Sequence, residues 1–159
     1  MSTSWRIMRA GEERAPEWAA LRAALWPDCT AAEHAAYLRQ LLGRGDTAVG
    51  FLAVETESGA ESRDTALGFA EATLRSDYVN GCQTSPVGFL EGWYVVPAAR
   101  GRGIGRALVT ATEDWARQRG CTEMASDARL DNTDAQRAHE ACGFDEATRV
   151  VYFHKRLRP

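Results

Sequence analysis

Hydrophobic and polar positions follow two different periods along this chain. Three stretches carry apolar residues at three- and four-residue spacing, which is typical of helices with one buried face. Six shorter stretches are predicted to be strands, most of them rich in β-branched and aromatic residues. The predicted helices are 16–26, 30–43, 103–119 and a further one that is capped by Asp131 or Asn132 and runs to about 141, and the predicted strands are 5–9, 49–55, 67–74, 87–96, 123–126 and 144–156.

Residues at the ends of the predicted helices support their boundaries. Pro16 suits the first turn of a helix, whereas Pro27 stops the same helix. Thr30 and Glu33 have the spacing of a capping box, in which each side chain accepts a hydrogen bond from the other residue's amide. Gly43 provides a C-terminal stop for this second helix.

The order of these elements predicts the fold class. Strands lie before and after helices, which indicates an α+β or α/β-type protein of three layers, with a mixed central sheet flanked by helices. A polar run at 55–64 forms the turn between the second and third strands, and 76–86 is a longer loop. No repeat or linker divides the 159 residues, and the length suits one core, so 1–159 is predicted to be a single domain.

Charge and cysteine usage restrict the possible partners and compartment. Nineteen Lys and Arg against 22 Asp and Glu give a net charge of −3, which argues against a nucleic-acid or polybasic membrane role. No apolar run is long enough to span a bilayer, and residues 1–5 lack the features of a secretory signal. Cys29, Cys82, Cys121 and Cys142 form no C-x-x-C pair, so we expect reduced, mostly buried thiols in a cytoplasmic protein.

A glycine- and arginine-rich segment, V-V-P-A-A-R-G-R-G-I-G-R at 95–106, separates a predicted strand from the clearest helix. The first amides of a helix have no partner within the helix and lie at its positive end, so they can bind an anion. Glycines allow the backbone to approach closely, and the arginines add charge, which points to a pyrophosphate. The alternative is a plain turn with solvated arginines. A Walker loop is excluded because G-K-[ST] is absent. A Rossmann dinucleotide loop is excluded because it needs G-x-G-x-x-G after an early strand, whereas the spacing here is R-x-x-G-x-G late in the chain.

R-x-x-G-x-G after a V-x-P-x-x-R strand end resembles motif A of the GNAT acetyltransferases. The resemblance implies the GNAT acyl-CoA N-acyltransferase fold, acetyl-CoA as cosubstrate and a homodimer. It also implies that the main chain of Val95 and Val96 meets pantetheine, that one of their amides polarises the thioester carbonyl, and that the following amides wrap the pyrophosphate. Asn132 matches a family position that contacts the cofactor, although a helix N-cap role is compatible with this. The implied cofactor-binding residues are Val95, Val96, Arg100, Gly101, Arg102, Gly103, Ile104, Gly105, Arg106 and Asn132.

Several longer stretches are similar to one branch of that family, the aminoglycoside 6′-N-acetyltransferases. They include L-R-A-A-L-W-P-D, S-D-Y-V-N-G-C, S-P-V-G-F-L-E-G, E-M-A-S-D and R-V-V-Y-F-H-K, and they span about Leu21 to Lys155. Aminoglycosides are polycations, so their pocket needs carboxylates and flat rings. The resemblance therefore implies that the substrate-binding residues are Trp26, Tyr78, Glu91 and Asp127, and that acetylation confers antibiotic resistance.

The residue types support these four positions unequally. Glu91 interrupts the apolar run F-L-E-G-W-Y, so it needs a partner or water inside a strand, which marks it as a site residue. Asp127 follows a strand and is a plausible cleft carboxylate, but it could also be a loop carboxylate or a cap. Trp26 could equally be a core aromatic, and Tyr78 could anchor its own loop.

The chemistry requires a neutral amine at the thioester, whereas alkylamines are mostly protonated at neutral pH. Asp127 is the predicted general base, with Glu91 assisting or holding a water. His139 stands where many GNAT enzymes have a tyrosine acid, and it is either that acid or a helix-surface residue. The histidines lack ligand-like neighbours, so no metal is expected.

Two competing functions remain open from the sequence. The acceptor could be a polyamine, another small metabolite amine or a protein N-terminus. The chain could also be an acyl-CoA-binding module without turnover, but such a module has no need of carboxylates beside the thioester.

Overall fold

The computed structural model describes residues 4–56 and 64–159. Most of the predicted polar turn therefore lies outside the described residues, as do the first three residues of the N-terminal segment. Contacts within the chain define two compact units, Met1–Asp127 and Ala128–Pro159.

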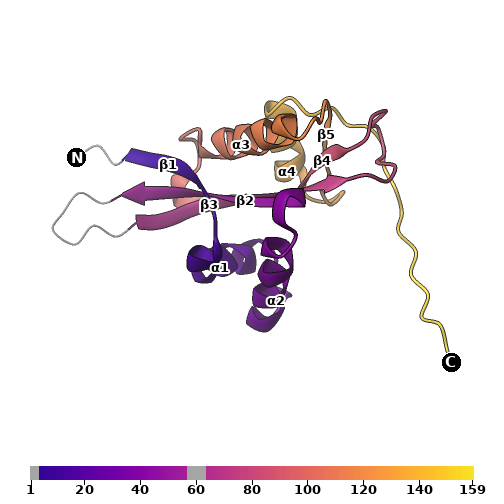
Figure 1. Ribbon diagram of the computed structural model, residues 1–159, viewed down its shortest axis with the longest axis horizontal. Helices are drawn as coiled ribbons and strands as arrows, with labels where there is room; N and C mark the ends of the chain where they lie inside the picture. Colours follow the sequence, from indigo (N-terminus) through magenta and orange to yellow (C-terminus); the bar gives the residue numbers. More distant parts are fainter. Residues whose placement is uncertain (1–3, 57–63) are drawn as a thin grey trace. The chain divides into compact units, whose positions relative to one another are not determined.

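The first unit contains a mixed five-stranded sheet in the order β1-β2-β3-β4-β5 (Figure 1). Neighbours pair antiparallel except β4 and β5, which pair parallel. The predicted strands of this unit are confirmed, although β2 and β3 run further into the predicted polar turn. Their bounds are β1 Ser4–Arg9, β2 Ala48–Thr56, β3 Asp64–Arg75, β4 Val87–Val95 and β5 Met124–Ser126.

The three predicted helices of this unit are also confirmed, as α1 Ala15–Leu25, α2 Ala31–Leu42 and α3 Ile104–Gln118. The predicted capping box opens α2. The Glu33 amide donates to Thr30 Oγ1 at 3.2 Å, and the Thr30 amide donates to Glu33 Oε2 at 2.6 Å. These local hydrogen bonds satisfy amides that the helix itself leaves unpaired.

Helices cover both faces of the sheet, with α1 and α2 on one side and α3 on the other (Figure 1). The α1/α2 side is filled by a cluster that includes the fully buried Trp18, Leu38 and Phe69. The α3 side is filled by a second cluster in which Trp115 packs with Ala72. Because side chains alternate along a strand, β3 supplies Phe69 to one layer and Ala72 to the other. The predicted three-layer α+β architecture with a mixed sheet is therefore confirmed.

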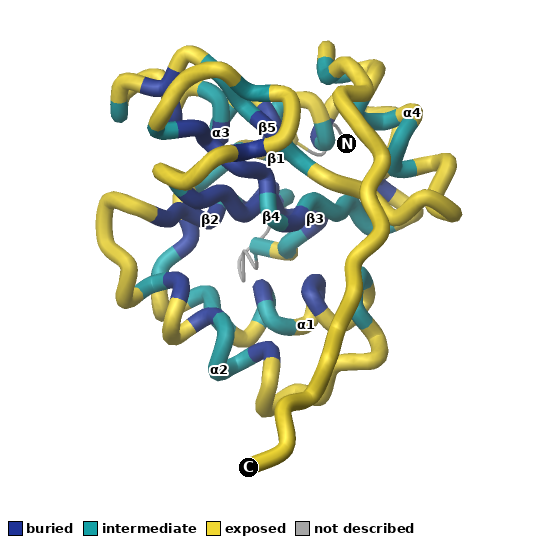
Figure 2. The backbone as a smooth tube through the Cα atoms, turned by 90° about the vertical axis from the view of Figure 1, so that its right-hand side faces the viewer, coloured by how far each residue is buried: buried dark blue, intermediate teal, exposed yellow. Residues whose placement is uncertain are grey.

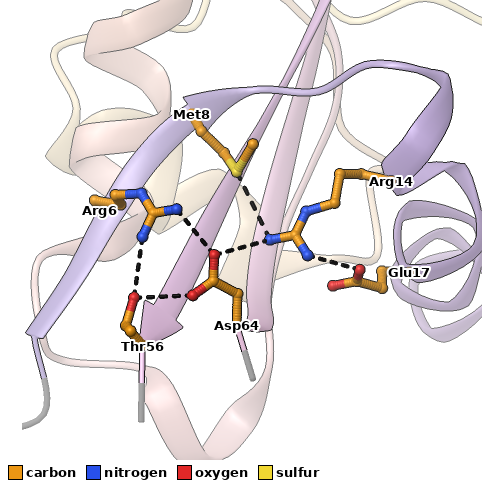
Figure 3. Close-up of polar contacts among 6 residues, drawn as sticks. All are labelled: Arg6, Met8, Arg14, Glu17, Thr56 and Asp64. Carbon is orange, nitrogen blue, oxygen red and sulfur yellow. Dashed lines mark hydrogen bonds and ion pairs between the residues drawn. The ribbon is translucent and has the colours of Figure 1, made fainter. Parts of the chain in front are cut away.

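A polar cluster joins the ends of β2 and β3 to β1 and α1 (Figure 3). Asp64 accepts from Thr56 Oγ1 and from Arg6, each at 2.9 Å, and Arg14 lies 3.5 Å from the same carboxylate. Arg14 also pairs with Glu17 at 2.8 Å. The hydrogen bond from Thr56, together with the arginines, lowers the pKa of the Asp64 carboxyl from its ordinary value.

The second unit contains one helix, α4 Thr133–Ala141, preceded by Asn132 as its cap. The predicted strand at 144–156 is wrong, because that segment is not a strand and pairs with none of the strands in the described residues. Its central apolar side chains, Val150, Val151, Tyr152 and Phe153, are between 51% and 93% exposed (Figure 2). High β-propensity describes how well a residue packs on a paired and half-buried surface, and no strand pairing among the described residues provides such a surface for this segment.

Candidate active site

Glu91 sits on a bulge in β4. Opposite β3, Leu90 pairs with Ala72 and Gly92 pairs with Glu71, so Glu91 is an extra residue with no partner of its own. A bulge of this kind bends the strand and redirects side chains. Here the Glu91 carboxylate accepts from Thr73 Oγ1 at 2.6 Å and from Arg75 at 2.9 Å. The predicted need of Glu91 for polar partners within an apolar strand is therefore met by β3.

Trp26 reaches the same part of β4 from the end of α1. A Cβ atom at Gly92 would lie 2.4 Å from Trp26 Cη2, so this glycine permits the indole to lie directly against the strand. The Trp26 ring also packs against Phe69, with centroids 6.2 Å apart, and it is only half-buried. Trp26 is therefore a core aromatic that also lies beside the bulge carrying Glu91, and its role in substrate binding stays a prediction.

A buried ion pair between Glu71 and Arg22 lies next to the Trp26 ring. Glu71 is fully buried, accepts from Trp18 Nε1 at 2.7 Å and forms a short ion pair with Arg22. The Arg22 guanidinium lies 4.6 Å from the Trp26 ring and 3.9 Å from the Tyr37 ring. Burial raises the pKa of the Glu71 carboxyl, and Arg22 and Trp18 oppose that rise. Burial, with the charges of Glu71 and Glu91, raises the pKa of Tyr37 to about 12.

Asp127 comes directly after β5 and is exposed. The parallel pairing of β4 and β5 ends at Leu90 and Ser126, where Ser126 Oγ also donates to the Leu90 carbonyl at 3.0 Å. Asp127 is thus the first residue beyond the ladder on β5, just as Glu91 is on β4. Glu91 and Asp127 therefore each come directly after the last residue pair of the β4–β5 ladder, Leu90 and Ser126.

Beyond the bulge, β4 continues to pair with β3 and leaves its other edge unpaired in the described part of the sheet. The Val96 amide donates to the Leu67 carbonyl at 2.8 Å, so it is committed to this ladder. Because hydrogen-bonding direction alternates along an antiparallel strand, the Val95 amide points away from β3. Of the two amides expected to polarise a thioester carbonyl, Val95 therefore has the suitable direction and Val96 does not.

The loop between β4 and α3 contains two glycines in the left-handed conformation. Gly101 has φ +79° and Gly103 has φ +80°, values that other residues adopt only with strain. Gly103 is the N-cap of α3, and no side chain caps that helix end. The first backbone bond of α3 is formed by Ala107, so the amides of 104–106 precede the ladder. This is the geometry of an anion-binding helix start.

The arginines around this loop have separate roles. Arg100 Nε donates to the Val95 carbonyl at 2.9 Å, which fixes the end of β4. Arg102 pairs with Glu55 at 2.7 Å, whereas Arg106 is exposed in the first turn of α3. Gly105 serves packing, because a Cβ atom there would lie 3.2 Å from the Trp93 ring, whose Nε1 donates to the Gly105 carbonyl.

The remaining candidate residues lie in a loop and in the second unit. Tyr78 is 81% exposed in the loop before β4, as expected for either a pocket wall or a loop residue. Asn132 Oδ1 accepts from the Ala135 amide at 3.0 Å, so its capping role is confirmed. His139 Nδ1 lies 2.6 Å from the Ala135 carbonyl, and its ring meets Phe144 edge-on. The structure does not test their predicted roles in cofactor binding and catalysis.

Three further expectations concern metals, membrane spans and thiols. The described residues contain no cluster of His, Cys, Asp and Glu able to hold a metal ion. None of their helices is long and apolar enough to cross a membrane. None of the four cysteines forms a disulfide, but of the four only Cys121 is buried, so the expectation of mostly buried thiols is wrong.

Sequence reasoning missed three charged residues that shape this region, namely Glu71, Arg22 and Arg75. Glu71 interrupts the apolar run G-F-A-E-A just as Glu91 interrupts its own strand, so the same signal could have found it. Arg22 and Arg75 carry no comparable signal, because arginine is common on helix surfaces and at strand ends.

Known proteins resemble this chain over nearly its full length. The family model described as the acetyltransferase (GNAT) family matches residues 6–144. Aminoglycoside N(6′)-acetyltransferase type 1 of Stenotrophomonas maltophilia is 48% identical over 96% of this chain and 94% of that protein. The crystal structure of aminoglycoside 6′-N-acetyltransferase AAC(6′)-Ih from Acinetobacter baumannii is 43% identical, with a TM-score of 0.86 over 97% of this chain and 99% of that one.

A further solved structure includes a bound molecule. Aminoglycoside N-acetyltransferase AAC(6′)-Iy in complex with CoA matches with a TM-score of 0.88 and 38% identity over 99% of this chain and 98% of that chain. The family match, the mixed sheet and the loop before α3 agree with one another. The chain belongs to the acetyltransferase (GNAT) family.

Proposed function

We propose that this protein is an aminoglycoside 6′-N-acetyltransferase that uses acetyl-CoA as its acetyl donor. The observation that carries the proposal is the arrangement along β4. Within a few residues, this strand presents Glu91 on a bulge, directs the Val95 amide to an open edge and leads into the left-handed glycines before α3. The relatives described above carry this activity in their names, and one of them binds CoA.

The residues present fit acetyl-CoA. The uncapped amides of 104–106 and the exposed Arg106 would hold the pyrophosphate, and the unpaired edge at Val95 would receive pantetheine. Arg100 supports this edge by holding the Val95 carbonyl, while Arg102 is already paired with Glu55. Asn132 is also proposed to contact the cofactor.

The proposed reaction is direct transfer. The ammonium form of the acceptor is attracted by Glu91, and Asp127 takes its proton, directly or through water, as the nitrogen approaches the thioester. The C–N bond forms and the C–S bond breaks, the second proton of the attacking nitrogen passes to the departing thiolate or to water, and the Val95 amide stabilises the negative charge that develops on the carbonyl oxygen. A thiol of pKa near 8.5 leaves readily as a thiolate, so an acid such as His139 is not essential. Trp26 and Tyr78 supply flat surfaces for the sugar rings.

An acceptor screen tests this function. Thiol release from acetyl-CoA is expected with kanamycin, is expected to be much slower with spermidine, and is expected to be absent without acceptor. Mass spectrometry should place the acetyl group on the 6′-nitrogen, and an analogue with a 6′-hydroxyl should not react. Equal turnover of spermidine would favour a polyamine acetyltransferase. Binding of acetyl-CoA without thiol release under any acceptor would favour a non-catalytic module.

Asp127→Asn tests the base. This substitution keeps shape and polarity but removes proton acceptance, so kcat should fall by about 10²–10⁴ while acetyl-CoA affinity stays near that of the wild type. His139→Ala is the comparison and should change kcat little. A fully active Asp127→Asn enzyme would limit Asp127 to substrate binding, and a tenfold or larger loss in His139→Ala would make His139 the acid.

We also propose that the protein is a cytoplasmic homodimer whose residues 1–159 form one domain. The exposed apolar side chains of 150–153 support the dimer, because contiguous exposed apolar surface is typical of an association site. Light scattering should give twice the mass of the chain. Replacing Val151 and Phe153 by serine should shift the mass toward that of a monomer, and an unchanged dimer would place the interface elsewhere.

A further inference from the structure

The Glu91 carboxylate is already matched by a cation from the same sheet. Arg75 Nη2 donates to both Glu91 oxygens at 2.9 Å, and Arg75 Nε lies 3.2 Å from Oε1. Thr73 Oγ1 also donates a hydrogen bond to Glu91 Oε1. An acceptor ammonium that binds to Glu91 therefore meets a carboxylate whose charge is balanced by a two-pronged guanidinium contact.

The Arg75 side chain can move away from the Glu91 carboxylate without breaking other hydrogen bonds of the described residues. In the described part of the chain, the hydrogen bonds of its side chain all go to Glu91, and its side chain is 42% exposed, whereas that of Glu91 is 21% exposed. The guanidinium carbon lies 3.4 Å from the centroid of the Phe89 ring, which gives the arginine a second favourable surface next to the carboxylate. A partly exposed ion pair contributes little to stability, so exchange of one cation for another costs little to the fold.

We infer that Arg75 is an internal competitor of the acceptor: its guanidinium occupies Glu91 in the free protein and is displaced by the acceptor ammonium. This inference rests on the proposed role of Glu91 in binding the acceptor. Displacement reduces the apparent affinity of every acceptor by the same factor, because only the fraction of molecules with a vacated carboxylate is competent to bind. A polycation with further contacts tolerates this reduction, whereas a simple amine with no other contacts binds weakly. Arg75 thus raises the threshold for binding, so that at a given low concentration only an acceptor with further contacts occupies the site.

The test compares Arg75→Gln with Arg117→Gln. Arg117 is an exposed arginine on α3 that pairs with Asp114 at 2.7 Å, so its substitution removes the same charge away from β4. Arg75→Gln should lower the KM for kanamycin, and its Kd by calorimetry, by about two- to fivefold, the scale of losing an exposed competing pair. The KM for acetyl-CoA should not change. Arg117→Gln should leave all three constants at wild-type values, which controls for net charge.

Two more variants separate the possible outcomes. Arg75→Lys keeps the charge but loses the two-pronged contact, so its KM should lie between the wild-type and Arg75→Gln values. In a Glu91→Gln background, Arg75→Gln should have no further effect on KM or Kd. Melting temperatures verify that each variant is folded.

The inference is overturned if Arg75→Gln leaves the kanamycin constants unchanged, or if it raises them, since Arg75 would then position Glu91 or contact the acceptor itself. If Glu91→Gln alone has no effect on either constant, the proposed role of Glu91 fails together with the inference. If Glu91→Gln weakens binding and Arg75→Gln does not strengthen it, only the inference fails.

Discussion

The glycine that begins α3 offers a prediction whose size follows from its geometry. Gly103 has φ +80°, and a Cβ atom placed there would meet nothing within 4 Å. Gly120, at the other end of the same helix, has φ +81° and equally open surroundings. Alanine at either position therefore suffers conformational strain without a steric clash, which costs about 1–2 kcal/mol. Gly103→Ala and Gly120→Ala should consequently lose similar amounts of stability in urea unfolding.

Binding of acetyl-CoA should distinguish the two variants. At Gly103 the added methyl group enters the space that the pyrophosphate is proposed to occupy and hinders its approach to the amides of 104–106. Loss of one charge-assisted hydrogen bond costs about 1.5–3 kcal/mol, which corresponds to a Kd roughly 10- to 150-fold weaker. Isothermal calorimetry with acetyl-CoA should show this loss for Gly103→Ala and wild-type affinity for Gly120→Ala. Equal affinities in two folded variants would refute the placement of the pyrophosphate.

Two other predictions concern the stability of the first unit. Glu71→Gln leaves the buried Arg22 charge without its partner, so it should lower the free energy of unfolding measured in urea by about 3–5 kcal/mol. The control is Glu17→Gln, which removes a partly exposed ion pair and should cost less than about 1 kcal/mol. Similar losses in the two variants would contradict the argument that burial makes the Arg22–Glu71 pair the more important one. The pKa of Asp64 is lower in the folded protein than in the unfolded chain. Its ionised form therefore stabilises the fold at pH values above the pKa of the unfolded chain, and this stabilisation is lost as the pH falls through the pKa of the folded protein. Asp64→Asn should therefore lower the urea midpoint at neutral pH, with a difference that narrows in acid, and a pH-independent difference would disprove the linkage.

The parts of the fold that could be predicted from the sequence depend on local interactions. Helix periods, the Thr30–Glu33 capping box and the glycine stops act within a few residues, and the structure confirms them. The loop before α3 could also be predicted, because its glycines and the start of a helix lie next to each other in the sequence.

The parts that could not be predicted depend on pairing between distant segments. Glu91 stood out as a charge in a strand, but its bulge requires the register with β3, and its partner Arg75 lies 16 residues earlier. The choice between the Val95 and Val96 amides likewise depends on which of them pairs with Leu67. The segment 144–156 has strand composition but no strand partner among the described residues, so propensity alone gave the wrong answer.

The bulge in β4 has an evolutionary consequence. Leu90 already pairs with Ala72, and Gly92 already pairs with Glu71, the residue before it. Deletion of Glu91 would therefore leave an uninterrupted ladder between β3 and β4, with Trp26 still seated on Gly92. The carboxylate occupies an inserted position that the sheet does not require. A lineage could gain or lose this acidic group by a single codon insertion or deletion without rebuilding the scaffold around it.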